Sequence, residues 1–139
     1  MREKHAFSHE RNAMNTVTAA GIIATTPRHI KTEEGLDITS FRLASNRRRY
    51  DDELQQWVDV DTNWYTVVAF RALAANAEKS LNKGDRVVVS GRVRIRDWEH
   101  DSGSGTSVEV EADALGHDLL WGTTTYSRSA LPEDDDEEE

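Results

Sequence analysis

Residues 86–98 read Arg-Val-Val-Val-Ser-Gly-Arg-Val-Arg-Ile-Arg-Asp-Trp, and the interpretation of the whole chain starts from this stretch. Side chains of a β-strand alternate between two faces, so a strand here separates two chemically different sets. One face would carry Val87, Val89, Val93 and Ile95, and the other Arg92, Arg94, Arg96 and Trp98. The sequence therefore predicts a strand with one face in a hydrophobic core and an opposite face that is cationic and wet.

Four other segments also have the composition and period of strands. They are residues 15–23, 37–45, 62–70 and 106–115. Residues 72–81 are rich in alanine and have apolar side chains at helical spacing, so we expect one short helix there. Two polar stretches, residues 46–61 and 100–105, are predicted to be loops.

The order of these elements indicates a fold class. Five strands with one short helix between the third and the fourth are typical of an all-β, five-stranded OB-fold, a Greek-key barrel whose helix covers one end. We expect this barrel over residues 14–122. A disordered lead-in over residues 1–13 would precede it, and a disordered acidic tail over residues 123–139 would follow it. Loops at residues 31–36 and 99–105 would flank the binding face.

The net charge of −9 is concentrated at one end of the chain. Residues 133–139 are seven consecutive acidic residues, and setting them aside leaves 19 of the 26 acidic residues against 17 basic ones. The body of the chain is therefore close to neutral, and its overall charge does not exclude an anionic partner. The absence of cysteine excludes disulfides, zinc–cysteine sites and a thiol nucleophile. No apolar run reaches membrane-spanning length, so we expect a cytoplasmic protein.

The cationic face of residues 92–98 indicates a ligand that has both phosphates and flat bases. Arginines hold the backbone of a single-stranded nucleic acid while aromatic rings stack on its unpaired bases. A second basic group consists of Arg47, Arg48 and Arg49, followed by Tyr50. Phosphate binding is at least as consistent with this group as a solvated patch.

The remaining aromatic side chains leave alternatives open. Trp64 shares a predicted strand face with Val68 and Phe70, so a core role and a base-stacking role are about equally consistent with it. The sequence alone favours a core role for Phe70, because large apolar side chains are mostly buried. Trp57 is expected to pack against its loop or a neighbouring subunit, and Trp121 to contact a neighbouring subunit or the end of the barrel.

No pattern in the sequence indicates catalysis or metal binding. The five histidines lack ligand spacing, and no catalytic triad, P-loop or paired-carboxylate motif is present. Glu109, Glu111 and Asp113 share a strand face, but a solvated charged face explains them better than a metal site. We therefore predict no enzyme activity, no cofactor and no metal. A metal-dependent nuclease would need carboxylates in a groove where the pattern has arginines, and a structural dimer module would leave the one-sided arginines unexplained.

Five segments carry a resemblance to a known family. Residues 15–21, 41–44, 62–70, 81–87 and 90–98 read NTVTAAG, FRLA, TNWYTVVAF, LNKGDRV and SGRVRIRDW. In this order and spacing they resemble the bacterial single-stranded-DNA-binding proteins, the SSB family. The resemblance implies base stacking by Trp64, Phe70 and Trp98. It implies backbone contacts by Arg94 and Arg96, which strand geometry extends to Arg92.

The same resemblance implies a biological role. The chain would form a homotetramer on the nucleoid and protect single-stranded DNA during replication, recombination or repair, largely without sequence preference. Replication or repair proteins would be further partners. An OB-fold accessory or RNA-binding protein of the primosomal type stays open as the alternative function.

Three features depart from the family pattern. Arg47 to Arg49 occupy a stretch where the family commonly has another aromatic residue, and Asp97 lies where a basic residue is usual. The acidic run follows Leu131-Pro132 and has no hydrophobic tip after it, so the docking of protein partners is left open. We hypothesise that the run competes with DNA for the arginines. Unchanged affinity at low salt after deletion of residues 133–139 would contradict that hypothesis.

Overall fold

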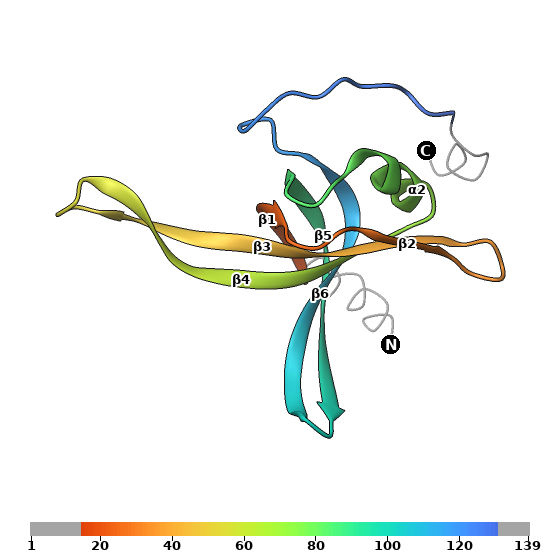
Figure 1. Ribbon diagram of the computed structural model, residues 1–139, viewed down its shortest axis with the longest axis horizontal. Helices are drawn as coiled ribbons and strands as arrows, with labels where there is room; N and C mark the ends of the chain where they lie inside the picture. The colour runs from red at the N-terminus through yellow and green to blue at the C-terminus, as the bar shows by residue number, and fades with distance from the viewer. Residues whose placement is uncertain (1–14, 131–139) are drawn as a thin grey trace, which may run out of the picture.

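The computed structural model describes residues 15–130, so the predicted lead-in over residues 1–13 and the acidic run over residues 133–139 lie outside the described residues. Figure 1 shows that the described residues are mostly strand, with a short helix packed against them. The elements are β1 (Thr16–Ile23), β2 (Arg28–Lys31), β3 (Asp37–Asp51), β4 (Gln56–Phe70), α2 (Arg71–Ser80), β5 (Arg86–His100) and β6 (Gly103–His117). In residues 15–130, α2 is neither long nor apolar enough to cross a membrane.

The strands form one sheet that closes on itself. Their order is β1-β5-β6-β4-β3-β2, and an additional pairing of β1 with β3 closes the barrel. All neighbours are antiparallel except β4 and β6, which are parallel. This is the OB-fold order, with the helix between β4 and β5, so the predicted fold class is confirmed. The predicted count of five strands misses β2, a short edge strand whose four mainly polar residues carry no readable alternation.

The barrel interior is apolar and is covered at one end by α2. Its fully buried side chains include Ile23, Leu43, Val67, Val87, Val89 and Val110. Ala74 and Ala77 of α2 are also buried, because small side chains let the helix lie close to the strands. The buried Thr39 hydroxyl donates a hydrogen bond of 2.8 Å to the Ala74 carbonyl oxygen and so ties the helix to β3.

Two long hairpins extend beyond the barrel (Figure 1). The prediction of a loop over residues 46–61 is wrong, because β3 continues to Asp51 and β4 already begins at Gln56. The predicted loop over residues 100–105 is likewise mostly strand. Nearly all side chains on both faces of these hairpins are exposed, so their sequences lack the alternation that marks a half-buried strand.

The predicted core face of β5 ends earlier than the sequence indicates. Val87 and Val89 are fully buried and Val93 is half-buried, whereas the Ile95 side chain is 65% exposed. The alternation of side chains continues along β5 beyond Val93, but this part of the strand no longer belongs to the barrel. The expectation that Ile95 lies in the core is therefore wrong, because β5 has by then left the barrel.

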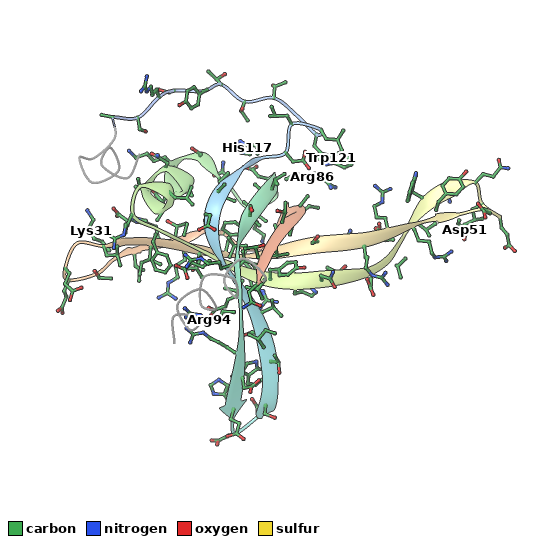
Figure 2. The ribbon with its side chains drawn as sticks, turned by 180° about the vertical axis from the view of Figure 1, so that it is seen from behind. Lys31, Asp51, Arg86, Arg94, His117 and Trp121 are labelled. Atoms are coloured by element: carbon green, nitrogen blue, oxygen red, sulfur yellow. The ribbon has the colours of Figure 1, made fainter. Side chains whose placement is uncertain are left out.

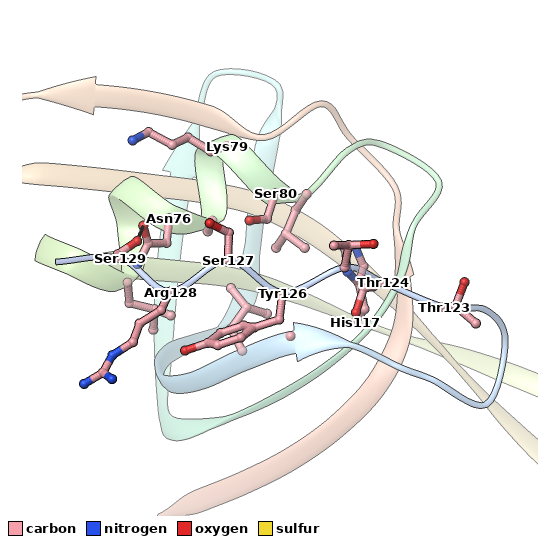
Figure 3. A pocket seen from close by; sticks show the side chains of 16 residues that line it. Asn76, Lys79, Ser80, His117, Thr123, Thr124, Tyr126, Ser127, Arg128 and Ser129 are labelled. Carbon is pink, nitrogen blue, oxygen red and sulfur yellow. Dashed lines mark hydrogen bonds between the residues drawn. The ribbon is translucent and has the colours of Figure 1, made fainter. Parts of the chain in front are cut away.

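Residues 118–130 have no helix or strand and run beside α2. The Ser129 hydroxyl donates a 3.1 Å hydrogen bond to the Asn76 side-chain oxygen, and an open groove of about 860 Å³ lies between this segment and the helix (Figure 3). At its start, the Trp121 ring lies under the Arg86 guanidinium, 3.9 Å from centroid to Cζ. Trp121 is thus a contact at the barrel end, and the boundary at residue 122 stays a prediction.

Candidate nucleic-acid interface

Four adjacent strands present one continuous outer face. In a sheet, residues paired across strands point to the same side. Thr66 of β4 pairs with Arg42 of β3 on one side and with Glu109 of β6 on the other. Glu109 in turn pairs with Arg94 of β5. This row defines what we call the outer face, which runs over β3, β4, β6 and β5 on the side opposite the core.

The three aromatic residues singled out from the sequence all belong to this face. Trp64 is 49% exposed, and the Arg42 guanidinium lies over its ring at 5.4 Å from the centroid. Phe70 is half-buried, while Val67 and Ala69, which point inward, are buried. A core role for Phe70, which the sequence alone favours, is therefore wrong, because the alternation of β4 turns its ring outward.

The indole of Trp98 lies close to Gly105 of the neighbouring strand. Trp98 pairs with Gly105 across the β5–β6 ladder. A Cβ atom at residue 105 would lie 2.5 Å from Cζ2 of the indole, so only glycine allows the ring to approach this closely. The ring is 42% exposed and contacts the His100 ring at a centroid distance of 5.6 Å. Trp98 is therefore held by its own strand pair and remains open to a ligand.

The arginines of β5 point to one side, as predicted, but they are not free cations. Arg92 Nη2 lies 3.2 Å from Glu111 Oε2, and Arg96 Nε lies 3.1 Å from Glu109 Oε2. Arg94 Nη2 reaches Glu111 Oε1 at 3.9 Å, at the point where the hairpin leaves the barrel (Figure 2). The arginine row is therefore paired with the acids of β6, an arrangement that the sequence did not indicate.

The three consecutive arginines of β3 are divided between two faces. Because residues 47–49 are in a strand, Arg48 points to the side of Tyr50, while Arg47 and Arg49 point to the other side. Arg47 is paired with Asp61 at 2.9 Å, and this hydrogen bond raises the pKa of Arg47 above its ordinary value. Arg48 lies 3.5 Å from Asp59. Residues 47–49 therefore do not form one cationic patch.

Tyr50 has an aromatic partner that sequence reasoning did not assign to the site. Trp57 is its cross-strand neighbour, and the two rings meet edge to face at a centroid distance of 5.6 Å. Both rings are exposed, and they lie near the tip of the β3–β4 hairpin. The signal was present in the sequence, since Trp57 and Val58 follow a short turn, but the polar neighbours indicated a loop.

The departure at Asp97 affects the opposite face of its hairpin. Asp97 pairs with Thr106, whose hydroxyl donates a 3.2 Å hydrogen bond to its carboxylate. Alternation turns it away from the side that carries Arg96 and Trp98. Within residues 15–130, no group of three or more His, Asp or Glu side chains is arranged to hold a metal ion.

The outer face of this OB barrel carries partly exposed aromatic rings beside arginines. These features define a class, the OB-fold proteins that bind single-stranded nucleic acid. Comparison with known proteins specifies the family. Residues 14–118 match the model of the single-strand binding protein family. The chain belongs to this family, so the resemblance inferred from the sequence is confirmed, and single-stranded DNA binding is confirmed as the function class.

Individual relatives cover most of the chain. It is 49% identical over 125 residues to single-stranded DNA-binding protein 2 of Tropheryma whipplei strain Twist, covering 88% of this chain and 82% of that protein. It is 43% identical over 117 residues to single-stranded DNA-binding protein 1 of Streptomyces coelicolor, covering 84% of this chain and 74% of that protein.

A solved structure is also similar. The crystal structure of the small single-stranded DNA-binding protein from Streptomyces coelicolor matches with a TM-score of 0.72 and 43% identity. The match covers 77% of this chain and 96% of that one. The chain is therefore similar to this protein both in sequence and in fold.

Proposed function

We propose that this chain binds single-stranded DNA along the outer face, largely without sequence preference and without catalysis. The observation that carries the proposal is the arrangement of Trp64, Phe70 and Trp98 on one side of the sheet, exposed or half-buried, with arginines between them. Every base has a π-face and every nucleotide has a phosphate, so such a surface accepts any sequence.

The proposed contacts divide into two kinds. Trp64, Phe70 and Trp98 stack on bases, and Tyr50 extends the aromatic surface along the β3–β4 hairpin. Phosphates are bound by Arg92, Arg94 and Arg96 on β5 and by Arg48, which lies on the side of Tyr50, whereas Arg47 and Arg49 point to the other side of the hairpin. A guanidinium has five N–H donors, so an arginine that is paired with one carboxylate retains donors for a phosphate oxygen.

The proposed biological role is the protection of single-stranded DNA during replication, recombination or repair, on the nucleoid in the cytoplasm. The RNA-binding or primosomal alternative is not favoured, because the relatives described above are all named single-stranded DNA-binding proteins. Competition between single-stranded DNA and RNA of equal length tests this choice. A preference for RNA would contradict it.

We propose further that the chain acts as a homotetramer. Support comes from large apolar side chains that are exposed in the single chain away from the outer face. They include Leu119, Leu120 and Tyr126. These side chains belong to one segment, residues 118–130, and apolar surface exposed in one region commonly marks a protein–protein contact.

One titration tests both proposals. A long single-stranded oligonucleotide is added while tryptophan fluorescence and molar mass in solution are measured on the same samples. We expect quenching on binding and the mass of four chains before DNA is added. The absence of quenching together with an unchanged mass would contradict DNA binding, and a monomer mass at micromolar concentration would contradict the tetramer.

A further inference from the structure

Arginines and carboxylates are paired across β5 and β6 on the outer face. Arg92, Arg94 and Arg96 stand on β5, and their partners Glu109, Glu111 and Asp113 stand on β6. Glu111 is shared, because its two carboxylate oxygens lie 3.2 Å from Arg92 and 3.9 Å from Arg94. With equal numbers of cations and anions, this part of the face carries no net charge.

The two glutamates are less exposed than the arginines that they contact. The Glu109 and Glu111 side chains are 24% and 35% exposed, whereas those of the three arginines are 46–60% exposed. The reason is position, since β6 is paired with both β4 and β5 at Glu109 and Glu111, whereas the pairing of β5 with β1 ends at Arg92. A ligand on this face would therefore meet guanidinium groups that are already paired with carboxylates of β6.

A local irregularity brings one more acid to the row. The ladder pairs Ser90 with Ala114 and Gly91 with Ala112, so Asp113 is an extra residue on β6. A Cβ atom at Gly91 would lie 2.1 Å from the Glu111 carbonyl oxygen, so glycine is required for this close approach. Asp113 reaches Arg92 at 3.7 Å, which gives that arginine two carboxylates.

We propose that Glu109 and Glu111 limit the affinity of the outer face for single-stranded DNA by competing with phosphates for the arginines of β5. The inference rests on the proposed function and on the DNA path over this face. Exposed ion pairs of this kind are weak, so phosphates can displace the carboxylates, but each carboxylate also repels the phosphate that approaches. These ion pairs therefore lower the affinity for single-stranded DNA and reduce the number of counterions that binding releases.

The same contacts are also consistent with the opposite effect on affinity, and the experiment must distinguish the two. A carboxylate that pairs with an arginine could hold the guanidinium in the geometry that a phosphate needs, and its removal would then weaken binding. Two observations favour competition. Each arginine side chain is more exposed than the glutamate that it contacts, and Glu111 contacts two arginines at once, so it cannot orient either one by a bidentate pair.

The test compares Glu109→Gln, Glu111→Gln and the double variant with the parent protein. Glutamine keeps the size and a hydrogen-bond acceptor and removes only the charge. Glu78→Gln is the matched control, because Glu78 is an exposed glutamate on α2 at the end of the barrel. Affinity for an oligothymidylate is measured by tryptophan quenching from low to high salt, and thermal melting checks that all variants are folded.

We expect each substitution on β6 to raise affinity about fivefold at low salt, the effect of one unit charge at about 4 Å in water. The gain should shrink as salt rises, because ions screen exposed charges. The double variant should have the steepest salt dependence. Glu78→Gln should bind like the parent.

Two results would overturn the inference while leaving the proposed function intact. Weaker binding of the folded Gln variants would assign an orienting role to the carboxylates. Affinity equal to that of Glu78→Gln would show that the ion pairs do not affect binding. If the parent itself fails to bind the oligothymidylate, the proposed function fails, and this inference fails with it.

Discussion

The barrel and the two projecting hairpins are built from the same strands, yet they are opposite in character. Inside the barrel, β3 and β5 bury Leu43, Val87 and Val89 completely. A few residues further along β5, the Ile95 side chain is mostly exposed, and Trp98 is open to solvent. Core packing is therefore confined to the barrel part of each strand, so a substitution on a hairpin should leave stability nearly unchanged.

The largest expected effect is on the stability of the barrel. Leu43→Ala removes a fully buried side chain and should lower the free energy of unfolding by about 2–5 kcal/mol. Ile95→Ala, on the hairpin, should change it by less than about 0.5 kcal/mol, because surface substitutions rarely do more. Urea denaturation followed by tryptophan fluorescence measures both. Equal destabilisation by the two substitutions would contradict the division between barrel and hairpin.

The next effect is on base stacking at the hairpin. Trp98→Ala should weaken binding to single-stranded DNA by about 1–3 kcal/mol, at low and high salt alike, because stacking releases no counterions. The control is Ile95→Ala, which alters the opposite face of the same hairpin. Fluorescence anisotropy of a labelled oligonucleotide gives the affinities. Parent-like binding by Trp98→Ala would remove this residue from the interface.

The smallest effect is on the salt dependence of binding. Replacing Arg94 and Arg96 by alanine should make the slope of log K against log salt shallower by about 0.7 for each phosphate that an arginine no longer neutralises. Lys79→Ala on α2, which removes an exposed cation at the barrel end, should leave the slope unchanged. A slope equal to that of the parent would mean that these two arginines do not bind phosphates.

The sequence predicted the parts of the fold that face the core. Alternation in residues 37–45 and 62–70 separated the two faces of β3 and β4, but in residues 62–70 it left open which face is buried. Alternation gave no signal in residues 46–61, because both faces of these strands are exposed. Here cross-strand pairs such as Tyr50 with Trp57 stabilise the hairpin. Such cross-strand pairs depend on which strands are neighbours in the sheet. The residue pattern of a single strand does not contain that information.

The same limit applies to the site. The sequence placed Trp98 and the arginines of β5 on one face, and the structure agrees. It also identified Glu109 and Glu111 as an outward face, but it could not align that face with the arginines. The alignment depends on the register of β5 against β6 and on the extra residue at Asp113, neither of which follows from alternation.

Photo-crosslinking can locate single-stranded DNA on the protein and so decide whether the DNA follows the outer face of the barrel. An oligonucleotide that contains 5-bromodeoxyuridine is irradiated on the parent protein, and the crosslinked peptides are identified by mass spectrometry. We predict crosslinks at Trp64, Phe70 and Trp98. Crosslinks confined to the exposed aromatic rings of residues 118–130, Trp121 and Tyr126, would contradict a DNA path over the outer face.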